Sequence, residues 1–477
     1  MSATGGLKKW LTGALALVTL VGELQAKRPN IILVMADDQG YGDTGYTGHP
    51  FLKTPHLDAM ARDSVVFNRF YAGAPVCSPT RASVLTGRTP MRTNVLHHGH
   101  YMRPAENTLA EELYKAGYRT AHFGKWHIGS VQKDSPASPG GQGFDEWLTG
   151  LNYFDRNPYL SHNGQYQQLK GQGTVLTMDA AIGFLDKHKA AQQPLFAVIW
   201  FPAPHSPHLE KSAQPNLYQD KKAKGYFQEI ALLDEQVGRL RSALRKMRIS
   251  DNTIVWYCSD NGGLLPESSG GRGKKGDVYE GGLRVPALLE WPEKLAHKSV
   301  STPASTSDIY PTLLALAGVK NTSTIPLDGI DLSSFLTGKK TRREQPIGFW
   351  HDYTAGEGTY SDRIIRALML AQKAGKPTPF PERLLKNVNE YPKRKPYANG
   401  SQPGHAALLD WPYKIHAIGD KRKGTRFELY NLEQDPMEKL NLATKEPAVF
   451  KKMKTAVLDW QASVIRSLEG GDYPAAE

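Results

Sequence analysis

The chain has 477 residues, of which 40% are hydrophobic, and it carries a formal net charge of +12 at pH 7. This length can bury a large core, and it predicts one large domain followed by a smaller one. Only two cysteines are present, which excludes a scaffold built from disulfides. The basic excess favours polyanionic partners.

Residues 1–26 have the pattern of a secretory signal peptide. Lys8 and Lys9 precede the apolar stretch 10–21, and Leu24-Gln25-Ala26 offers a small-residue cleavage site. The stretch is too short to span a bilayer comfortably, and no later run of about 20 apolar residues follows. We therefore expect a periplasmic or secreted protein with no transmembrane span after cleavage, and an uncleaved anchor is the alternative.

Apolar runs typical of buried strands alternate with helical patterns at 57–64, 108–116, 226–246 and 307–317. Four of these runs end in polar residues, and they span 30–35, 119–123, 194–201 and 252–258. Such runs are typical of parallel sheets, and open α/β sheets carry their sites at the carboxyl ends of strands. We expect an α/β fold with a large, mixed, mostly parallel sheet sandwiched by helices.

A smaller α+β domain is expected at 346–477, after a large domain at 27–345. The segment 373–403 is rich in Lys, Pro, Gly and Asn and predicts a long irregular loop. Two runs, 411–418 and 425–430, predict an antiparallel hairpin, and a terminal helix is expected around 447–468.

Oxygen ligands follow two of the strand-like runs. Asp37, Asp38, Asp260 and Asn261 suit Ca²⁺ or Mg²⁺ rather than Zn²⁺. Adjacent strand residues point to opposite faces, so Asp37 and Asp38 can share one ion only where the chain leaves strand geometry. The segment 39–43 favours that departure. The alternative is that these residues are turn formers that cap backbone groups.

Cys77 begins the pentad Cys77-Ser78-Pro79-Thr80-Arg81. Pro79 suits the first turn of a helix, which would place residue 77 at a helix N-terminus, where free amides favour an anion. The alternatives for Cys77 are a small buried residue or a disulfide with Cys258. Cys258 itself lies in an apolar run and is expected to be inert.

Six segments together resemble motifs of the type I sulfatases of the alkaline phosphatase superfamily. They are Asp37-Asp38, the pentad at 77–81, and the segments 124–129, 203–207, 259–262 and 279–286. The resemblance spans 30–340, and the segments 428–432, 435–436 and 441–442 resemble the C-terminal part of the family.

The resemblance implies that Cys77 is oxidised to formylglycine, whose hydrate attacks the sulfur of a sulfate ester. A formylglycine-generating or anaerobic sulfatase-maturating enzyme would be the partner for this modification. Asp37, Asp38, Asp260 and Asn261 would bind calcium with one oxygen of hydrated residue 77, and Mg²⁺ is the alternative ion. Arg81 would steady the diol.

The resemblance also implies roles for two histidines and two lysines. His127 would be the base that returns the sulfated intermediate to the aldehyde, and His205 the acid that protonates the departing alcohol. Lys125 and Lys275 would hold the sulfate oxygens. Lys274, beside Lys275, stays open as the alternative.

The expected function is therefore hydrolysis of sulfate esters, in a sulfated carbohydrate or an aryl sulfate. A phosphomonoester or phosphodiester hydrolase is the first alternative, and an inactive polyanion-binding protein is the second. Nucleic acid fits an exported protein less well than sulfated polysaccharide, and it is not an expected partner. Basic clusters lie at 393–395 and 421–423, with the aromatic residues Tyr391, Tyr397 and Trp411. These residues could line a groove for a sulfated carbohydrate or form a solvated surface, and the two interpretations stay equally open.

Overall fold

The computed structural model describes residues 28–266, 269–352, 354–383, 402–420 and 424–473. The expected signal peptide lies outside the described residues, as do the clusters 393–395 and 421–423 with Tyr391 and Tyr397. None of the helices within these ranges is long and apolar enough to cross a membrane.

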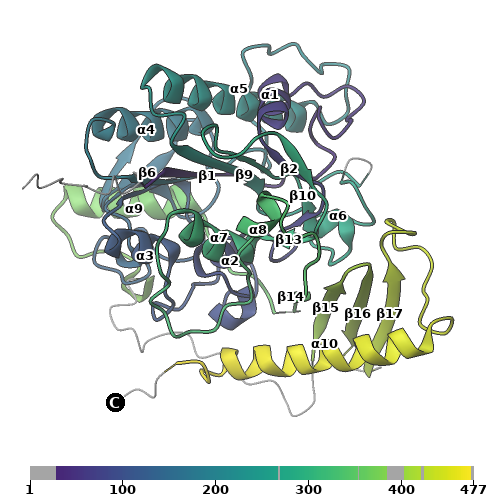
Figure 1. Cartoon of the computed structure of the whole chain (residues 1–477). Helices are drawn as coiled ribbons and strands as arrows, with labels where there is room; N and C mark the ends of the chain where they lie inside the picture. Colours follow the sequence, from purple (N-terminus) through teal and green to yellow (C-terminus); the bar gives the residue numbers. More distant parts are fainter. Residues whose placement is uncertain (1–27, 267–268, 353, 384–401, 421–423, 474–477) are drawn as a thin grey trace, which may run out of the picture.

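A ten-stranded sheet forms the centre of the molecule, in the order β12-β2-β11-β9-β1-β8-β4-β5-β6-β7 (Figure 1). The strands are β1 (Asn30–Ala36), β2 (Val65–Phe67), β4 (Arg119–Lys125), β5 (Glu146–Gly150), β6 (Tyr159–His162), β7 (Gln165–Gln168), β8 (Leu195–Trp200), β9 (Thr253–Ser259), β11 (Leu288–Glu290) and β12 (Lys298–Val300). The run β9-β1-β8-β4-β5 is parallel, whereas β11, β6 and β7 pair antiparallel. The expected mixed, mostly parallel sheet is confirmed.

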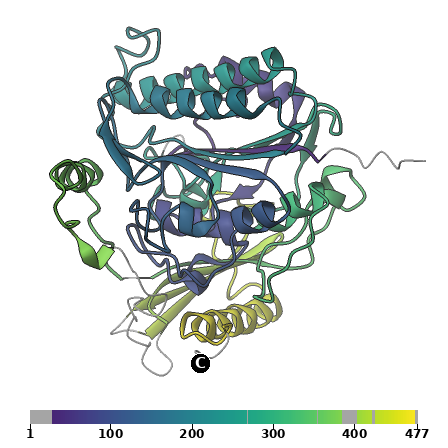
Figure 2. The ribbon, with the colours of Figure 1, turned by 90° about the vertical axis from the view of Figure 1, so that its left-hand side faces the viewer.

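Helices cover both faces of this sheet, which gives three layers (Figure 2). One layer holds α1 (Pro55–Asp63), α4 (Gly173–His188) and α5 (Lys224–Lys246), and the other holds α2 (Cys77–Thr86), α3 (Leu109–Lys115), α7 (Ile309–Leu316) and α8 (Ser333–Leu336). The sequence of β1 is continuously apolar because its side chains pack into the core on both faces of the sheet. Ile31 and Leu33 join one core cluster, and Ile32 and Val34 join the other. Both faces of the strand are buried, as parallel sheets require.

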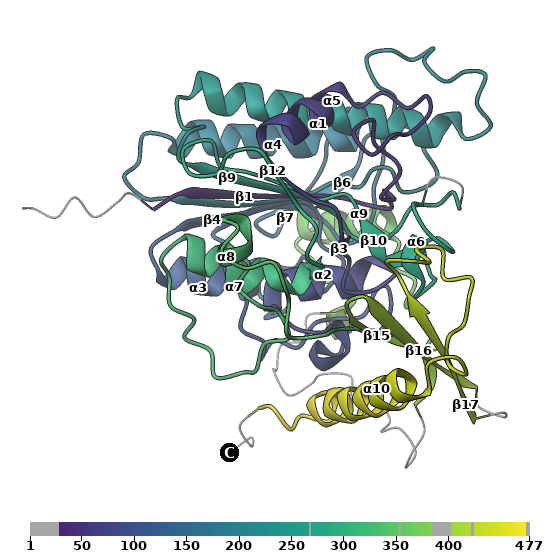
Figure 3. The same ribbon diagram turned by 45° about the vertical axis from the view of Figure 1, so that its right-hand side comes forward.

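A four-stranded antiparallel sheet follows, in the order β14-β15-β16-β17, and α10 (Pro447–Leu468) packs against it (Figure 3). Its strands are β14 (Ile347–His351), β15 (Gly404–Asp410), β16 (Tyr413–Asp420) and β17 (Gly424–Asn431). The expected hairpin corresponds to β16 and β17, and the expected terminal helix to α10. Strand β15 and helix α9 (Ser361–Lys373) were not expected.

A buried charge cluster joins this sheet to the larger body. Lys414 of β16 is fully buried, and its Nζ lies 3.0 Å from Glu280 Oε1 and 3.1 Å from Glu438 Oε1. Glu280 begins α6 (Glu280–Leu283), which follows the loop that carries Lys275. The C-terminal sheet therefore contacts a segment beside the candidate site directly.

The remaining elements are short. A three-stranded sheet contains β3 (Phe70–Tyr71), β10 (Arg284–Val285) and β13 (Ala304–Ser305), and the 3-10 helices are η1 (Pro90–Thr93), η2 (Gly140–Gln142), η3 (Thr306–Asp308) and η4 (Pro381–Arg383). Local sequence sets some of the boundaries. At the start of α3, Thr108 and Glu111 form a capping box, and Pro55 occupies the first turn of α1.

Candidate active site

Polar residues converge where the central parallel strands end. Ala36 of β1 lies opposite Ser259 of β9, so Asp37 and Asp260 leave the sheet side by side. Met35 and Gly124 both lie opposite Trp200 of β8, which brings Lys125 to the same edge. Carboxyl ends of parallel strands build the sites of open α/β sheets.

Asp38 leaves strand geometry, because its φ is 79°. Its backbone N–H donates to Asp260 Oδ1 at 3.1 Å, and its Oδ1 accepts from Asn261 Nδ2 at 2.9 Å. An aspartate with a backbone in the left-handed region is uncommon, and this conformation persists only where the surrounding contacts hold it. This turn brings Asp38 into hydrogen-bond contact with Asp260 and Asn261.

Cys77 is the first residue of α2, and its side chain is buried. Its Sγ lies 3.3 Å from His127 Nδ1, and the Ser78 hydroxyl donates to the His127 carbonyl at 2.6 Å. Burial raises the pKa of the Cys77 thiol, so the thiol is protonated at neutral pH and is a poor nucleophile. Cys77 and Cys258 are both free, so the disulfide alternative is wrong.

Three cations neutralise the carboxylates. Arg81 Nη2 lies 2.6 Å from Asp260 Oδ2, and Lys125 Nζ lies 2.7 Å from Asp37 Oδ2. Lys275 Nζ lies 2.6 Å from Asp38 Oδ1. Lys274 is exposed, so Lys275 is the lysine of this pair that faces the site.

The two buried carboxylates Asp37 and Asp260 differ in pKa. Burial raises the pKa of Asp37, but the charge of Lys125, with His205 and Arg81, brings it well below its usual range. Burial, with the nearby Asp37 charge, raises the pKa of Asp260 to about 7. The carboxylate of Asp260 is therefore the less stabilised of the two in its ionised form.

The donor set fits a hard cation. Ligand atoms of Asp37, Cys77 and Asp260 all lie within 4.8 Å of one another. Oδ1 of Asp37 and Oδ1 of Asn261 are buried and have no hydrogen-bond partner within the described part of the chain. Buried oxygens without partners are rare in native proteins, and Ca²⁺ and Mg²⁺ prefer oxygen ligands. The Cys77 sulfur is the exception, since a thiol is a soft ligand.

Two histidines border this group. His127 is buried, and its Nε2 has no hydrogen-bond partner among the residues described. His205 is partly exposed, stacks on Tyr153 at a ring separation of 4.6 Å, and places Nε2 3.9 Å from Asp38 Oδ2. Burial lowers the pKa of both imidazoles, so both are neutral at neutral pH in this arrangement.

All ten residues expected from the sequence thus gather at one edge of the sheet, and the structure adds three more. Ser78 fixes the His127 carbonyl, Tyr153 stacks on His205, and His98 lies near Lys275, Lys125 and His205. Burial, with His97 and the charges of Lys275 and Lys125, lowers the pKa of His98 to about 4. The run His97-His98-Gly99-His100 was a visible signal for His98, whereas no local pattern marks Tyr153.

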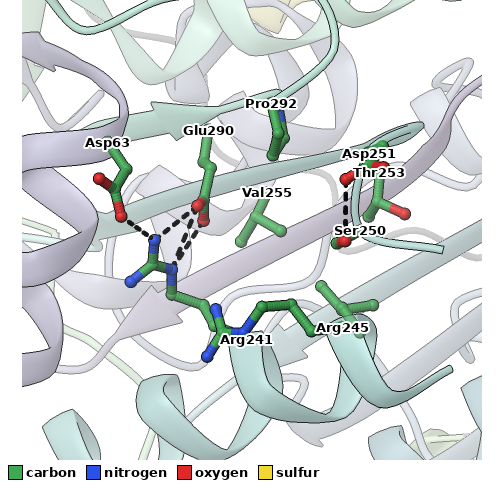
Figure 4. Close-up of a pocket in the computed structure, with 10 residues that line it drawn as sticks. Asp63, Arg241, Arg245, Ser250, Asp251, Thr253, Val255, Glu290 and Pro292 are labelled. Carbon is green, nitrogen blue, oxygen red and sulfur yellow. Dashed lines mark hydrogen bonds and ion pairs between the residues drawn. The ribbon is translucent and has the colours of Figure 1, made fainter. Parts of the chain in front are cut away.

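A separate cavity of about 250 Å³ lies near the start of β9, at the other end of that strand from Asp260 (Figure 4). Arg241 donates to Glu290 at 2.6 Å and to Asp63 at 2.7 Å. These carboxylates already have a cationic partner. The cavity is therefore explained by an ion-pair cluster that joins α5, α1 and β11.

Known proteins resemble this chain in sequence and in structure. The family model described as Sulfatase matches residues 29–319. The N-acetylgalactosamine-6-sulfatase of Canis lupus familiaris is 32% identical over 373 residues, which cover 68% of this chain and 69% of that protein. The ulvan-active sulfatase of Formosa agariphila is 30% identical over 466 residues, which cover 91% of this chain and 87% of that protein.

A solved structure extends the similarity to the whole fold. The crystal structure of Ps i-CgsB superposes with a TM-score of 0.74 at 26% identity, over 91% of this chain and 93% of that one. The same protein has been solved in complex with k-i-k-neocarrahexaose.

Proposed function

The chain belongs to the sulfatase family and is a sulfuric ester hydrolase, and on that premise we propose that it acts on a sulfated carbohydrate after Cys77 becomes formylglycine. The observation that carries the proposal is the position of Cys77. Its thiol is buried and protonated, yet it lies among hard oxygen ligands at the start of α2. An oxygen-bearing residue 77 fits these surroundings better than sulfur does.

We assign the metal site to Asp37, Asp38, Asp260 and Asn261, with calcium as the ion and magnesium as the alternative. Support comes from the unpartnered Oδ1 atoms of Asp37 and Asn261 and from the charge of Asp260. When present, the hydrated aldehyde supplies a hydroxyl that attacks sulfur and can later release sulfate by re-forming a carbonyl, while calcium supplies fixed positive charge beside it. Arg81, between Asp260 and the Lys125 carbonyl, holds these ligands in place.

His127 is proposed to accept a proton at Nδ1 from residue 77. The 3.3 Å separation of Nδ1 from Sγ is within reach for such a transfer. Burial keeps the imidazole neutral, and the tautomer with its proton on Nε2 would leave Nδ1 as the acceptor. The Ser78 hydroxyl fixes the backbone of His127 and with it the direction of the ring.

His205 is proposed to donate a proton at Nε2 to the oxygen of the leaving sugar. The side chain lies at the open rim of the site, and its Nδ1 lies 2.7 Å from the Ser206 carbonyl. A bound sulfate and the nearby Asp38 carboxylate both favour the imidazolium form that this role needs. Tyr153 orients the ring by stacking.

Lys125 and Lys275 are proposed to hold the sulfate oxygens. Both ammonium groups already point into the site, where they pair with Asp37 and Asp38. Fixed positive charges placed where negative charge shifts in the transition state lower the barrier without reorganisation. Lys275 has the required position, whereas Lys274 is exposed.

The substrate class is supported by three relatives. Their names or complexes mention N-acetylgalactosamine-6-sulfate chemistry, ulvan and k-i-k-neocarrahexaose. We further propose that the protein is matured by a formylglycine-generating or anaerobic sulfatase-maturating enzyme and is periplasmic or secreted.

The test is desulfation of defined sulfated oligosaccharides, with 4-nitrophenyl sulfate and 4-nitrophenyl phosphate assayed side by side. We expect release of inorganic sulfate from at least one oligosaccharide and a clear preference for the aryl sulfate. Equal or faster turnover of the aryl phosphate would contradict the proposal.

A further inference from the structure

A basic pocket lies at the edge strand β12, apart from the carboxylates of the candidate active site. Its volume is about 450 Å³, and its walls come from β12, from the segment after α8 and from Trp411 in the β15–β16 turn. In the sheet, β12 is separated from β9 by β2 and β11. Three strand spacings of about 4.8 Å place it roughly 14 Å from the line of β9.

The lining of this pocket is cationic. Five of its residues are basic, namely Arg69, Lys298, Lys340, Arg342 and Arg343, and no carboxylate is found among the described residues that line it. Arg343 is already paired with Asp308, at 2.6 and 3.0 Å. Lys298, Lys340 and Arg342 form no ion pair with any residue in the described ranges. Arg69 likewise has no carboxylate partner among the described residues, so the pocket holds four cations without a protein counter-charge.

The geometry around Lys298 leaves space for its ammonium group. A Cβ atom at Gly338 would lie 2.5 Å from Lys298 Nζ, and Gly338 has a φ of 79°. A side chain here would be strained by the backbone and would displace the ammonium. Lys298 Nζ has only the Phe335 carbonyl nearby, at 3.5 Å.

Arg69 is fixed by two contacts. Its guanidinium lies 3.8 Å over the Trp411 ring, and Nη1 donates to the Ser301 carbonyl at 2.5 Å. Stacking uses the face of the guanidinium and leaves the other in-plane N–H groups for an oxyanion. The ring face that Arg69 covers cannot stack on a nucleobase.

Hydroxyl groups complete the pocket and tie its walls together. Thr302 Oγ1 donates to the Thr341 carbonyl at 2.7 Å, which joins the segment after β12 to the segment after α8. Ser301 Oγ accepts from Asn68 Nδ2 at 3.0 Å. Serine and threonine hydroxyls beside unpaired cations can bind both the sulfates and the hydroxyls of a sugar chain.

We propose that this pocket is a second binding site for sulfated polysaccharide, which holds the polymer while another part of the same chain occupies the catalytic site. The inference rests on the proposed substrate class. A single sugar ring is smaller than the separation from β9, whereas a polymer spans it. Binding at two places on one chain raises the effective concentration of sulfate esters at the catalytic edge.

The test removes three charges, in the variant Lys298→Ala/Lys340→Ala/Arg342→Ala. Its control is Lys170→Ala/Lys246→Ala/Lys451→Ala, which removes three exposed lysines elsewhere. We expect the dissociation constant for dextran sulfate at low salt to rise about tenfold in the pocket variant and to change little in the control. Turnover of 4-nitrophenyl sulfate should be unchanged in both, since neither set belongs to the catalytic group.

An equal rise in the dissociation constant for dextran sulfate in the two variants would overturn the proposal. The proposal would also fail if the native protein bound unsulfated dextran as tightly as dextran sulfate. Tighter pocket-dependent binding of single-stranded DNA than of dextran sulfate would assign the pocket to nucleic acid instead. Lys340→Gln/Arg342→Gln provides a milder variant, for which we expect a smaller rise in the same constant. If aryl sulfate turnover were absent in every protein, the proposed function would fail, while the binding comparison would still decide this inference.

Discussion

The Sγ atom of Cys77, the first residue of α2, lies 3.3 Å from Nδ1 of His127, and both side chains are buried. Burial raises the pKa of the thiol and lowers that of the imidazole, so the pair is neutral rather than a thiolate and an imidazolium. A cysteine nucleophile needs the opposite shift of the thiol. The geometry therefore suits proton transfer between residue 77 and His127 but not cysteine catalysis.

Replacing Cys77 by Ser should leave a hydroxyl nucleophile that cannot re-form a carbonyl. We expect a single turnover at most, with sulfate retained on the protein, and no activity at all in Cys77→Ala. A pre-steady-state assay of product release from an aryl sulfate measures this. Steady multiple turnover by Cys77→Ser at the native rate would contradict the mechanism.

Replacing His127 by Ala removes the proposed proton acceptor. We expect kcat to fall by about 10²–10⁴-fold, the usual contribution of general acid–base catalysis, with a smaller change in KM. The control is His162→Ala, since His162 is exposed. A His127→Ala enzyme with native kcat would exclude the assigned role.

Removing the metal should abolish activity and lower the thermal unfolding midpoint, because the buried Oδ1 atoms of Asp37 and Asn261 would lose the ion proposed to bind them, and a ligand that binds only the native state stabilises it. Treatment with EDTA is compared with treatment with calcium-saturated EDTA, which controls for the chelator. We expect added Ca²⁺ to restore both activity and midpoint. An exhaustively chelated protein that kept full activity and an unchanged midpoint would argue against the site at Asp37 and Asp260.

Glu229 should make the stability of the fold depend on pH. Burial, with the charge of Glu210, raises its pKa to about 9 from an ordinary value of 4.5. The native state then keeps a proton that the unfolded chain loses, so this contribution is complete below pH 4.5 and is lost as pH rises towards 9.

We therefore expect Glu229→Gln to match the native unfolding midpoint at pH 5 and to exceed it at pH 9. Thermal unfolding at both pH values measures the difference, with exposed Glu469→Gln as the control. Parallel pH profiles for the native protein and Glu229→Gln would show that this carboxyl does not titrate as expected.

Much of the large sheet could be predicted from the sequence, since its strands are buried on both faces. The expected strands 30–35 and 252–258 lie within one residue of the ends of β1 and β9. Helix α9 could also have been found, because Ile364, Ile365 and Leu368 have helical spacing and are buried. Strand β15 was harder to predict, since it follows a Pro- and Gly-rich segment and owes its pairing to distant partners.

The candidate site was predictable as a set of residues but not as an arrangement. The spacing to Glu280 favoured Lys275 in the sequence but left Lys274 open as the alternative. The choice between them depends on the loop, in which the backbone N–H of Lys275 donates to the Gly263 carbonyl at 3.0 Å. Tyr153 reaches His205 only through tertiary packing, which no local pattern encodes.

The most direct measurement is mass spectrometry of the peptide that contains residue 77, taken from protein of measured specific activity. The account predicts an aldehyde or its hydrate at this position, in a fraction that rises in proportion to the activity. Fully active protein in which residue 77 is an unmodified cysteine would contradict it.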